Sequence, residues 1–478
     1  MPPSASRSLI LCLISTAALT SGCRLAEPTS SQSLAPDLAR DIPEAWSNPW
    51  EAPDKAATGW LADFDNLVLR KLIREAVGKN YDLKAASARI DAAAARVRIS
   101  GANRLPGLTA DLSGSRSQRL RGSNFDKITA NQFSAGLNLD WEFDLWGRLK
   151  DQRKASVDRF VASDADYQAA RLSLAATIPR NAFNLLEAER QIELSLQNLQ
   201  SLRTNLAILD GRLEAGDFDD RTALDISLSR SDVLRSEAGI NANRRLVDSS
   251  KRTLETLLGR FPDASLKALA EFPTVKRAVP AGLPVDLLFR RPDLIAAERR
   301  VRAATREATA TRKSLLPNIR ITGNTGTSTT ENFSDLLDPK ALVWSIAGSL
   351  SQQIFQGGRN RANITLSDAQ RDELAATFAN AVLQAFREVE TALSAEKYFV
   401  AQQQKLTEAT EEADRAEELA LSQYEEGLVE IITVLESQRR AFDLRSNLLN
   451  VTNQRLQNRI DLYLALGGDF DHAPSIAE

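Results

Sequence analysis

Carboxylate side chains are concentrated at two short glycine-containing segments, EAGDFDD at 214–220 and YEEGLVE at 424–430. Clustered carboxylates can attract cations or surround a narrow opening with negative charge. Each acid could equally be a solvated residue at the end of a helix, and the sequence leaves both interpretations open. The acids concerned are Asp217, Asp219, Asp220, Glu425, Glu426 and Glu430.

Histidine and cysteine, on which many enzymes and metal sites depend, are almost absent. The 478-residue chain has one histidine, His472, near its end and two cysteines, Cys12 and Cys23, near its start. The body of the chain therefore offers no Cys/His dyad, no Ser/His/Asp triad and no metal site based on these residues. With 60 basic and 63 acidic residues there is also no basic surplus for nucleic acid. We expect no catalytic, cofactor-binding or metal-binding residues and no nucleic-acid partner.

The first 22 residues have the pattern of a targeting segment. Arg7 precedes the apolar run SLILCLISTAAL, and TSGC follows, ending at Cys23. Small residues before a lone cysteine resemble a bacterial lipoprotein signal, although Thr20 stands where leucine is usual. We expect Cys23 to be lipidated, and Arg24 suits sorting to an outer membrane. Ordinary signal-peptide cleavage nearby is the alternative.

The sequence contains two copies of one unit, separated by 211 residues. Residues 82–93 (DLKAASARIDAA) and 293–304 (DLIAAERRVRAA) are identical at seven of twelve positions. Several landmarks in one register indicate duplication, and the period is too long for a solenoid array. The same offset relates Leu105, Pro106, Gly147, Gly216 and Leu224 to Leu316, Pro317, Gly358, Gly427 and Leu435.

In each copy the period of the apolar residues changes from helix to strand and back to helix. Helices are predicted at about 82–103 and 293–313, and each ends at a Leu-Pro pair because proline cannot continue it. A polar strand and then an alternating apolar strand follow, which predicts one β-hairpin per copy, at about 106–145 and 317–356.

The predicted strands have features that are typical of strands in a membrane. Their length of about ten to thirteen residues suits a tilted crossing, and aromatic residues cluster near their ends. A soluble hairpin with one face packed on helices would alternate too. A four-stranded sheet has two open edges, which lipid does not tolerate, so strands of several chains must close one barrel. The candidate membrane-interface aromatics are Trp141, Phe143, Trp146 and Trp344.

Each hairpin is followed by a very long helical pattern, at roughly 148–212 and 359–424. Such a helix of about 65 residues would measure on the order of 100 Å. From Phe378 onward, ten of the fourteen positions spaced four and three residues apart are apolar, which favours coiled-coil packing. Pro179 is expected to interrupt and kink the first long helix. Both patterns end at a glycine turn, from which a second helix returns.

The stretch LLFRRPDL at 287–294 raises the question of what two adjacent arginines do before a helix. Asp293 and Leu294 have counterparts in Asp82 and Leu83, so we interpret them as helix-starting residues in both copies. Arg290 and Arg291 are expected to tie the helix start to a neighbouring helix, in a role that belongs to the second copy alone.

Several motifs together carry a resemblance to a known family over about residues 60–468. They are LLFRRPDL with AAERRVRAA, LLPNI at 315–319, IFQGGRNRA at 354–362, LQAFREVETAL at 383–393, and YEEG at 424–427 with VLESQR at 434–439. In these motifs the chain resembles the TolC-type outer membrane efflux proteins. It is most similar to the NodT-like lipoprotein branch, which serves resistance-nodulation-division drug pumps.

The resemblance implies a mainly α chain with membrane β-strands, which forms a homotrimer in contact with outer membrane lipid. Three chains would build a 12-stranded transmembrane β-barrel, continued by a long periplasmic α-helical barrel. This passive duct would carry drugs or other small molecules from an inner membrane efflux pump and a periplasmic membrane fusion (adaptor) protein to the exterior. Gly216, Asp217, Gly427 and Leu428 would lie at the tip that contacts the adaptor. Threefold symmetry would arrange the acids near these turns as candidate gate carboxylates.

These patterns define the expected organisation of the chain. We predict a signal peptide at 1–22, an extended segment at 23–60, repeats at 61–270 and 271–468, and a tail at 469–478. Two other functions stay open. One is an outer membrane duct for type I protein secretion, which would share the fold. The other is a structural coiled-coil envelope lipoprotein, which would not explain the alternating hairpins.

Overall fold

A computed structural model describes residues 43, 45–47, 63–121, 126–216, 222–274, 279, 284–330 and 332–468. The predicted signal peptide, Cys23, Asp217, Asp219, Asp220 and the tail at 469–478 lie outside the described residues. The chain forms two compact units. The sheet unit contains residues 91–162 and 297–379, and the core unit contains residues 42–90, 163–296 and 380–478. None of the described helices has a stretch long and apolar enough to cross a membrane.

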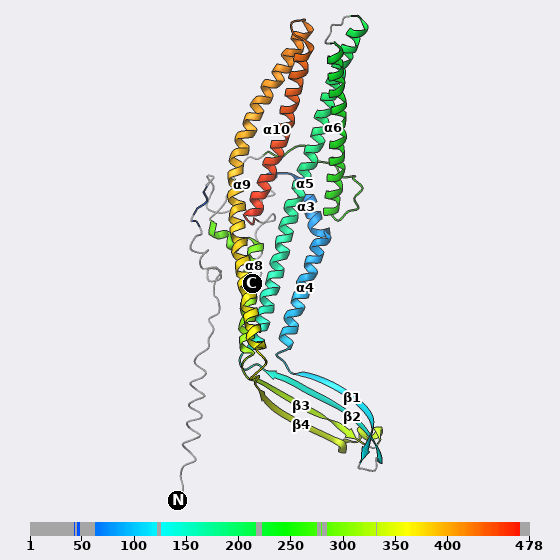
Figure 1. Cartoon of the computed structure of the whole chain (residues 1–478), viewed down its shortest axis with the longest axis vertical. Helices are drawn as coiled ribbons and strands as arrows, with labels where there is room; N and C mark the ends of the chain where they lie inside the picture. Colours follow the sequence, from blue (N-terminus) through cyan, green and yellow to red (C-terminus); the bar gives the residue numbers. More distant parts are fainter. Residues whose placement is uncertain are drawn as a thin grey trace. The chain divides into compact units, whose positions relative to one another are not determined.

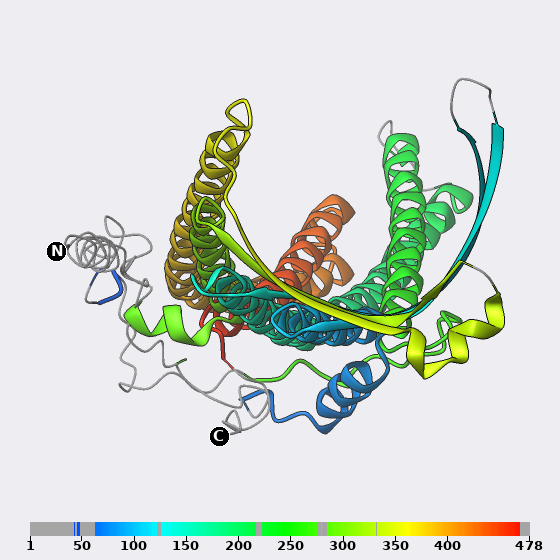
Figure 2. The same ribbon diagram turned by 90° about the horizontal axis from the view of Figure 1, so that it is seen from below.

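Four antiparallel strands form the sheet of the sheet unit, in the spatial order β1-β2-β3-β4 (Figure 1). The strands are β1 (Gly107–Arg121), β2 (Asp126–Phe143), β3 (Asn318–Thr329) and β4 (Leu342–Ser351). Seen from below, the sheet is curved (Figure 2). With 15 and 18 residues, β1 and β2 are longer than the ten to thirteen residues expected. The alternating pattern therefore locates these strands but underestimates their extent.

The helices repeat with the offset found in the sequence. Helices α4 (Tyr81–Ala102) and α8 (Pro292–Lys313) each have 22 residues, and their starts are 211 residues apart. Helices α5 (Arg148–Glu214) and α9 (Arg359–Glu425) each have 67 residues, with the same offset. The remaining α-helices of the described residues are α3 (Leu67–Lys79), α6 (Thr222–Leu257), α7 (Leu287–Arg290) and α10 (Ile431–Ala465).

Pro179 lies inside α5, which continues without a break. The predicted interruption at this proline is therefore wrong. A proline in a helix removes one backbone hydrogen bond and costs about 3 kcal/mol. The adjacent Ile178 and Phe183 are fully buried, as is Ala175, one turn before the proline. Tertiary packing of this kind supplies most helix stability in proteins, which explains why the helix persists here.

The predicted packing stripe of α9 is confirmed. All fourteen positions that step by four and three residues from Phe378 to Tyr424 are buried or half-buried. Three of the four polar members of the stripe have partners on α10: Glu396 and Gln403 both bond to Arg455, and Glu417 pairs with Arg445. A sustained spacing of 3.5 residues keeps one face of a long helix against its neighbour.

Two clusters of buried apolar residues stabilise the core unit. The larger one joins α3, α5, α9 and α10 and includes Ile73, Phe183, Val389 and Tyr463. The smaller one includes Leu209, Ile226 and Val434, near the turns that connect α5 to α6 and α9 to α10. Trp46, in the segment predicted to be extended, is also buried and lies 5.9 Å from the ring of Phe386.

Candidate functional site

One face of the sheet is apolar across all four strands. The register aligns Leu108 with Leu139, Trp141 with Ile321, and Ile319 with Leu350, which places these residues on the same face. Most of the large side chains on this face are exposed, and Trp344 keeps 75% of its surface accessible. The face comprises Leu108, Ala110, Leu112, Leu137, Leu139, Trp141, Phe143, Ile319, Ile321, Trp344, Ile346 and Leu350.

The opposite face carries a hydrogen-bonded polar row. Asn138 donates to the Asp111 carboxylate, and Asn324 donates to Asn138 over 2.6 Å. Ser345 is the residue aligned with Asn324 on β4, so the row reaches the fourth strand. A sheet with one apolar and one polar face suits a position between lipid and water. The sequence shows Asn138 as a polar alternating residue, but only the register reveals its partners.

Aromatic side chains lie at two levels of β2, at its C-terminal end and close to its middle. Trp141 and Phe143 stack edge to face at 5.5 Å, and Phe133 contacts Phe333 at 5.7 Å. The ten residues between Phe133 and Phe143 span about 33 Å along a strand, which a tilt of about 40° reduces to about 25 Å. That is close to the height of the apolar band of a membrane barrel. Trp344 aligns with Thr325, four residues from the level of Trp141.

The two tryptophans next to the helices also hold the strand ends. Trp141 donates its indole N–H to the Arg104 carbonyl oxygen at 3.0 Å, and Trp146 donates to the Pro317 carbonyl oxygen at 2.7 Å. Trp146 also lines a cavity of about 400 Å³ in the sheet unit. The cationic residues around this cavity are paired with acids: Arg148 with Glu142, Lys313 with Asp151, and Arg320 with Asp140. Paired charges of this kind stabilise the strand ends and leave no excess charge for an anionic ligand.

The turns at the ends of α5 and α9 have the geometry expected of helix-terminating glycines. Gly216 and Gly427 have φ values of +80° and +75°, a conformation that glycine adopts without strain. The Leu428 N–H bonds to the Gln423 carbonyl at 2.8 Å, as in a Schellman motif. A Cβ added at either glycine would meet no atom within 4 Å. Both turns are therefore open on the outside.

The acids of the second turn are exposed, but the structure does not bring them into a binding site. Glu425 and Glu426 lie at the end of α9, and Glu430 precedes the first residue of α10 without capping it through its side chain. Among the described residues, no group of three or more His, Cys, Asp or Glu side chains could hold a metal ion. Directly after Glu430, Ile431 is buried in the smaller cluster and Ile432 is 40% exposed.

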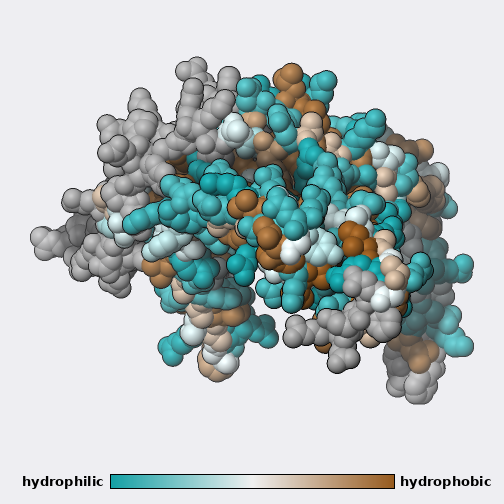
Figure 3. All heavy atoms as spheres, turned by 90° about the horizontal axis from the view of Figure 1, so that it is seen from above, coloured by the Kyte–Doolittle hydropathy of each residue, from teal (hydrophilic) through white to brown (hydrophobic). Residues whose placement is uncertain are grey.

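The surface around the turns is mainly hydrophilic. Figure 3 shows the face that carries the α9–α10 turn, on which the coloured hydrophobic residues form only small patches. Leu428, directly after Gly427, is 69% exposed. The adaptor-contact and gate roles of these residues stay predictions, since they concern other molecules.

Comparison with known proteins agrees with this geometry. Residues 72–260 and 283–468 match the family described as outer membrane efflux protein, one match for each repeat. The chain is 32% identical to the outer membrane protein OprJ of Pseudomonas aeruginosa over 468 residues, which cover 96% of each protein. It is 27% identical to the probable outer membrane lipoprotein SilC of Salmonella typhimurium, with coverages of 96% and 98%.

A solved structure shares the fold along most of the chain. The structure of the outer-membrane channel OprN has a TM-score of 0.79 and 25% identity, and the match covers 88% of this chain and 98% of OprN. The predicted fold class, outer membrane location and efflux function are thereby confirmed. The chain belongs to the outer membrane efflux protein family and is an outer membrane channel component of an efflux system.

Proposed function

We propose that three copies of this chain form one passive duct, which carries drugs or other small molecules out of the cell. The observation that supports it best is the open sheet with one apolar and one polar face. Strands β1 and β4 are its edges, and the outer side of each is not paired with another strand among the described residues. In lipid these groups require strands from further copies, which close the sheet into a barrel.

The number of copies follows from the space that a duct needs. Two copies would give eight strands, and side chains fill the interior of a barrel of that size. Three copies give twelve strands and a wider lumen. The apolar face would then contact outer membrane lipid, and the polar row of Asp111, Asn138 and Asn324 would line the lumen. Trp141, Phe143, Trp146 and Trp344 would contact the membrane interface.

The turns around Gly216 and Gly427 are the proposed contacts for a periplasmic adaptor, which links the duct to an inner membrane pump. Their support is the open space beside both glycines and the exposed Leu428. Gly427→Trp should abolish adaptor capture and drug resistance, whereas Leu383→Trp, at an exposed position of α9 far from the turn, should not. Intact capture by Gly427→Trp would remove this assignment.

The acids near the turns are the proposed gate carboxylates: Asp217, Asp219, Asp220, Glu425, Glu426 and Glu430. Three copies of each acid around one axis would add their potentials where the duct narrows. Neutralising the responsible acid should weaken the preference for cations, measured as the reversal potential in a salt gradient across a planar bilayer. Unchanged selectivity in all six Asp→Asn and Glu→Gln variants would exclude the ring.

Lipid attachment at Cys23 is a separate proposal. It rests on the TSGC signal, and a similar protein, SilC, is named as a probable lipoprotein. Mass spectrometry of the mature N-terminus should show a diacylglyceryl group and a fatty acid on Cys23. An unmodified N-terminus at another residue would show ordinary cleavage instead.

Deletion of the gene tests the whole proposal. We expect sensitivity to several unrelated small toxic compounds, restored by the wild-type gene, and ion conductance from the purified trimer. Loss of a secreted protein with unchanged drug sensitivity would favour a duct for protein secretion. A protein that lacks conductance would fit a structural envelope lipoprotein.

A further inference from the structure

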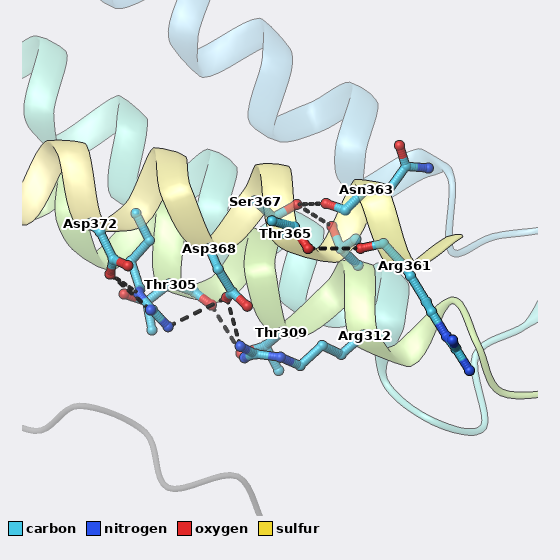
Figure 4. A network of polar contacts seen from close by, with 11 residues as sticks. Thr305, Thr309, Arg312, Arg361, Asn363, Thr365, Ser367, Asp368 and Asp372 are labelled. Carbon is cyan, nitrogen blue, oxygen red and sulfur yellow. Dashed lines mark hydrogen bonds and ion pairs between the residues drawn. The ribbon is translucent and has the colours of Figure 1, made fainter. Parts of the chain in front are cut away.

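Contacts in the sheet unit place parts of four helices in a row. Ser100 of α4 bonds to Ser156 of α5 at 2.7 Å, and Asp158 of α5 pairs with Arg306 of α8 at 2.7 Å. Arg312 of α8 pairs with Asp368 of α9 at 2.6 Å, within the polar network shown in Figure 4. The order is therefore α4, α5, α8, α9. Helices α4 and α9 end the row, as β1 and β4 end the sheet.

The internal seam between the two repeats, formed by α5 and α8, is held by buried charges. Asp158, only 5% exposed, lies 2.7 Å from Arg306 and 3.5 Å from Arg299. Asp151, 9% exposed, lies 2.5 Å from Lys313. Two acids on one helix thus face three cations on the other. Removing either side would leave buried charge without a partner, which strongly destabilises a protein.

The same positions can be located on the two end helices, because the repeats keep their 211-residue offset in three dimensions. The bond between Ser100 and Ser156 recurs as that between Thr311 and Ser367, at 3.1 Å. All five charges of the internal seam have alanine as their counterpart. Ala362 and Ala369 on α9 replace Asp151 and Asp158, and Ala88, Ala95 and Ala102 on α4 replace Arg299, Arg306 and Lys313.

Exposure distinguishes the two sets of positions. On α5 and α8, the seam residues Asp151, Ala155, Asp158, Ala162, Ala303, Arg306, Ala310 and Lys313 are all buried or half-buried. Their counterparts on α9 and α4 are all exposed; these are Ala362, Leu366, Ala369, Glu373, Ala92, Ala95, Ile99 and Ala102. Leu366 is 56% and Ile99 is 62% exposed, although alanine occupies both positions on the internal seam.

We propose that α9 of one copy packs against α4 of the next copy through these two exposed stripes. This seam lacks the five paired charges of the internal seam, which we call the ion clamp. The inference rests on the proposed trimer and specifies which residues join its chains. Repeating the internal arrangement across copies buries both stripes and continues the row of helices around the ring, as edge pairing of β4 with β1 continues the sheet. Leu366 and Ile99 supply apolar volume where the internal seam has alanine.

The two kinds of seam differ in how readily they separate. Opening the internal seam separates Asp158 from Arg299 and Arg306, and Asp151 from Lys313. Opening the seam between copies separates mainly alanine, leucine and isoleucine side chains: the α4 stripe holds no charge, and Glu373 is the one charged residue of the α9 stripe. Separate chains can therefore exist before assembly without a buried unpaired charge, and the weaker seams of the ring lie between copies.

Transplanting the ion clamp tests the assignment. Ala369→Asp places an acid at the counterpart of Asp158, where a second copy would bury it without a partner. We expect this trimer to dissociate at a lower temperature than wild type on mild detergent gels. Ala95→Arg, the counterpart of Arg306, should restore the dissociation temperature when both changes are present. Ala369→Asn separates the effect of size from that of charge.

A matched control uses Ser87→Arg, which adds the same charge to an exposed position of α4, roughly 80° around the helix from Ala95. It should not rescue Ala369→Asp. An Ala369→Asp trimer as stable as wild type, or equal rescue by Ser87→Arg, would overturn the seam. Circular dichroism should show unchanged helix content in all variants, since Ala369 is exposed within one chain.

Crosslinking distinguishes a wrong seam from a wrong trimer. The only cysteines are Cys12 and Cys23, so the chain beyond residue 23 offers a cysteine-free background. Ala95→Cys with Ala369→Cys, treated with a short bismaleimide, should give covalent dimers and trimers, whereas either single variant should give none. Wild-type protein that is monomeric by native mass spectrometry would refute the trimer itself. A wild-type trimer without crosslinks would refute only the seam.

Discussion

The two repeats make the same backbone contact with different side chains. In the first repeat, Asn80 donates to the carbonyl of Leu257, the last residue of α6, at 3.0 Å. In the second, Arg291 donates to the carbonyl of Ala465, the last residue of α10, at 3.1 Å. Both bonds satisfy a carbonyl that the helix itself cannot pair. The duplicated fold therefore conserves the acceptor and leaves the donor free to change.

Asn80 and Arg291 differ in the other hydrogen bonds that they form. The side-chain oxygen Oδ1 of Asn80 accepts hydrogen bonds from the backbone N–H groups of Asp82 and Leu83 and so caps α4. Arg291 forms a two-bond contact with Asp293 and reaches Glu388 of α9 at 2.7 Å. Burial alone would lower the pKa of the Arg291 guanidinium, but the hydrogen bonds and charges of both acids outweigh burial and raise this pKa.

This result confirms one part of the interpretation of LLFRRPDL and corrects another. Arg291 does tie the start of α8 to a neighbouring helix, through Glu388. Its role is not confined to the second copy, because Asn80 makes the equivalent bond to the return helix. The strand ends show the same substitution of donors: Trp141 bonds to the Arg104 carbonyl and Gln352 to the Leu315 carbonyl, at 3.0 and 3.4 Å.

Replacing each donor with alanine should have unequal effects on the two repeats. Arg291→Ala removes a buried cation that joins two acids and a carbonyl, so we expect a loss of about 3 kcal/mol. Asn80→Ala removes a helix cap and one hydrogen bond, for about 1 to 2 kcal/mol. Thermal unfolding of the purified protein in detergent measures both. The control is Arg290→Ala, at the adjacent, half-exposed arginine, and an equal loss there would contradict the role of Arg291.

The helices and strands can be predicted from the sequence because they depend on the spacing of apolar residues. The duplication shows each of these patterns twice. The helix stripe from Phe378 and the glycine ends at Gly216 and Gly427 follow from local rules. Contacts between distant segments do not. Nothing in the sequence pairs Arg291 with Glu388 or Asp111 with Asn138, since these pairs depend on packing and on strand register. The acids at 217–220 lie outside the described residues, so the proposed gate stays a prediction.

The glycines that close the return helices offer a second contrast between regions of the chain. Gly259 and Gly467 have φ values of +70° and +66°. A Cβ at Gly259 would lie 2.8 Å from the Lys79 carbonyl oxygen, and one at Gly467 would lie 3.1 Å from the Arg290 carbonyl oxygen. At Gly216 and Gly427 the same atom meets open space. Gly259 and Gly467 therefore need glycine both for the left-handed backbone conformation and because neighbouring atoms approach closely. Gly216 and Gly427 need glycine for the backbone conformation alone.

Alanine substitutions should separate these two requirements. Gly259→Ala should cost about 2 to 3 kcal/mol, because backbone atoms must move as well as adopt a left-handed conformation. Gly467→Ala should cost slightly less, since its closest contacts, at 3.0 to 3.1 Å, are longer than the 2.8 Å contact at Gly259. Gly216→Ala should cost about 1 kcal/mol, from conformation alone. Equal losses at Gly259 and Gly216, measured by thermal unfolding, would show that close approach contributes nothing.

A charge pair found only in the first repeat gives the smallest expected effect. Arg260 binds the Glu75 carboxylate through two hydrogen bonds of 2.6 and 3.0 Å. In the second repeat Asp286 occupies the counterpart of Glu75. Where LLGR at 257–260 aligns with ALGG at 465–468, the offset is 208 and Gly468 is the counterpart of Arg260. The hydrogen bonds from Arg260 are the main cause that lowers the pKa of Glu75 to about 2. A fall in pH should therefore destabilise the first repeat through the Glu75–Arg260 pair, which has no counterpart in the second repeat.

The direction of this pH dependence follows from the lowered pKa. A carboxylate with a folded-state pKa below its unfolded value contributes stability above about pH 4.5, which is lost as the pH falls towards about 2. Arg260 is 43% exposed, so solvent screening limits the contribution to under about 1 kcal/mol. Glu75→Gln should thus flatten stability between about pH 4.5 and 2 relative to wild type, with little change at pH 7 beyond the lost pair. Asp286→Asn is the matched control in the second repeat, and an equal flattening of its stability profile would remove the assigned difference between the repeats.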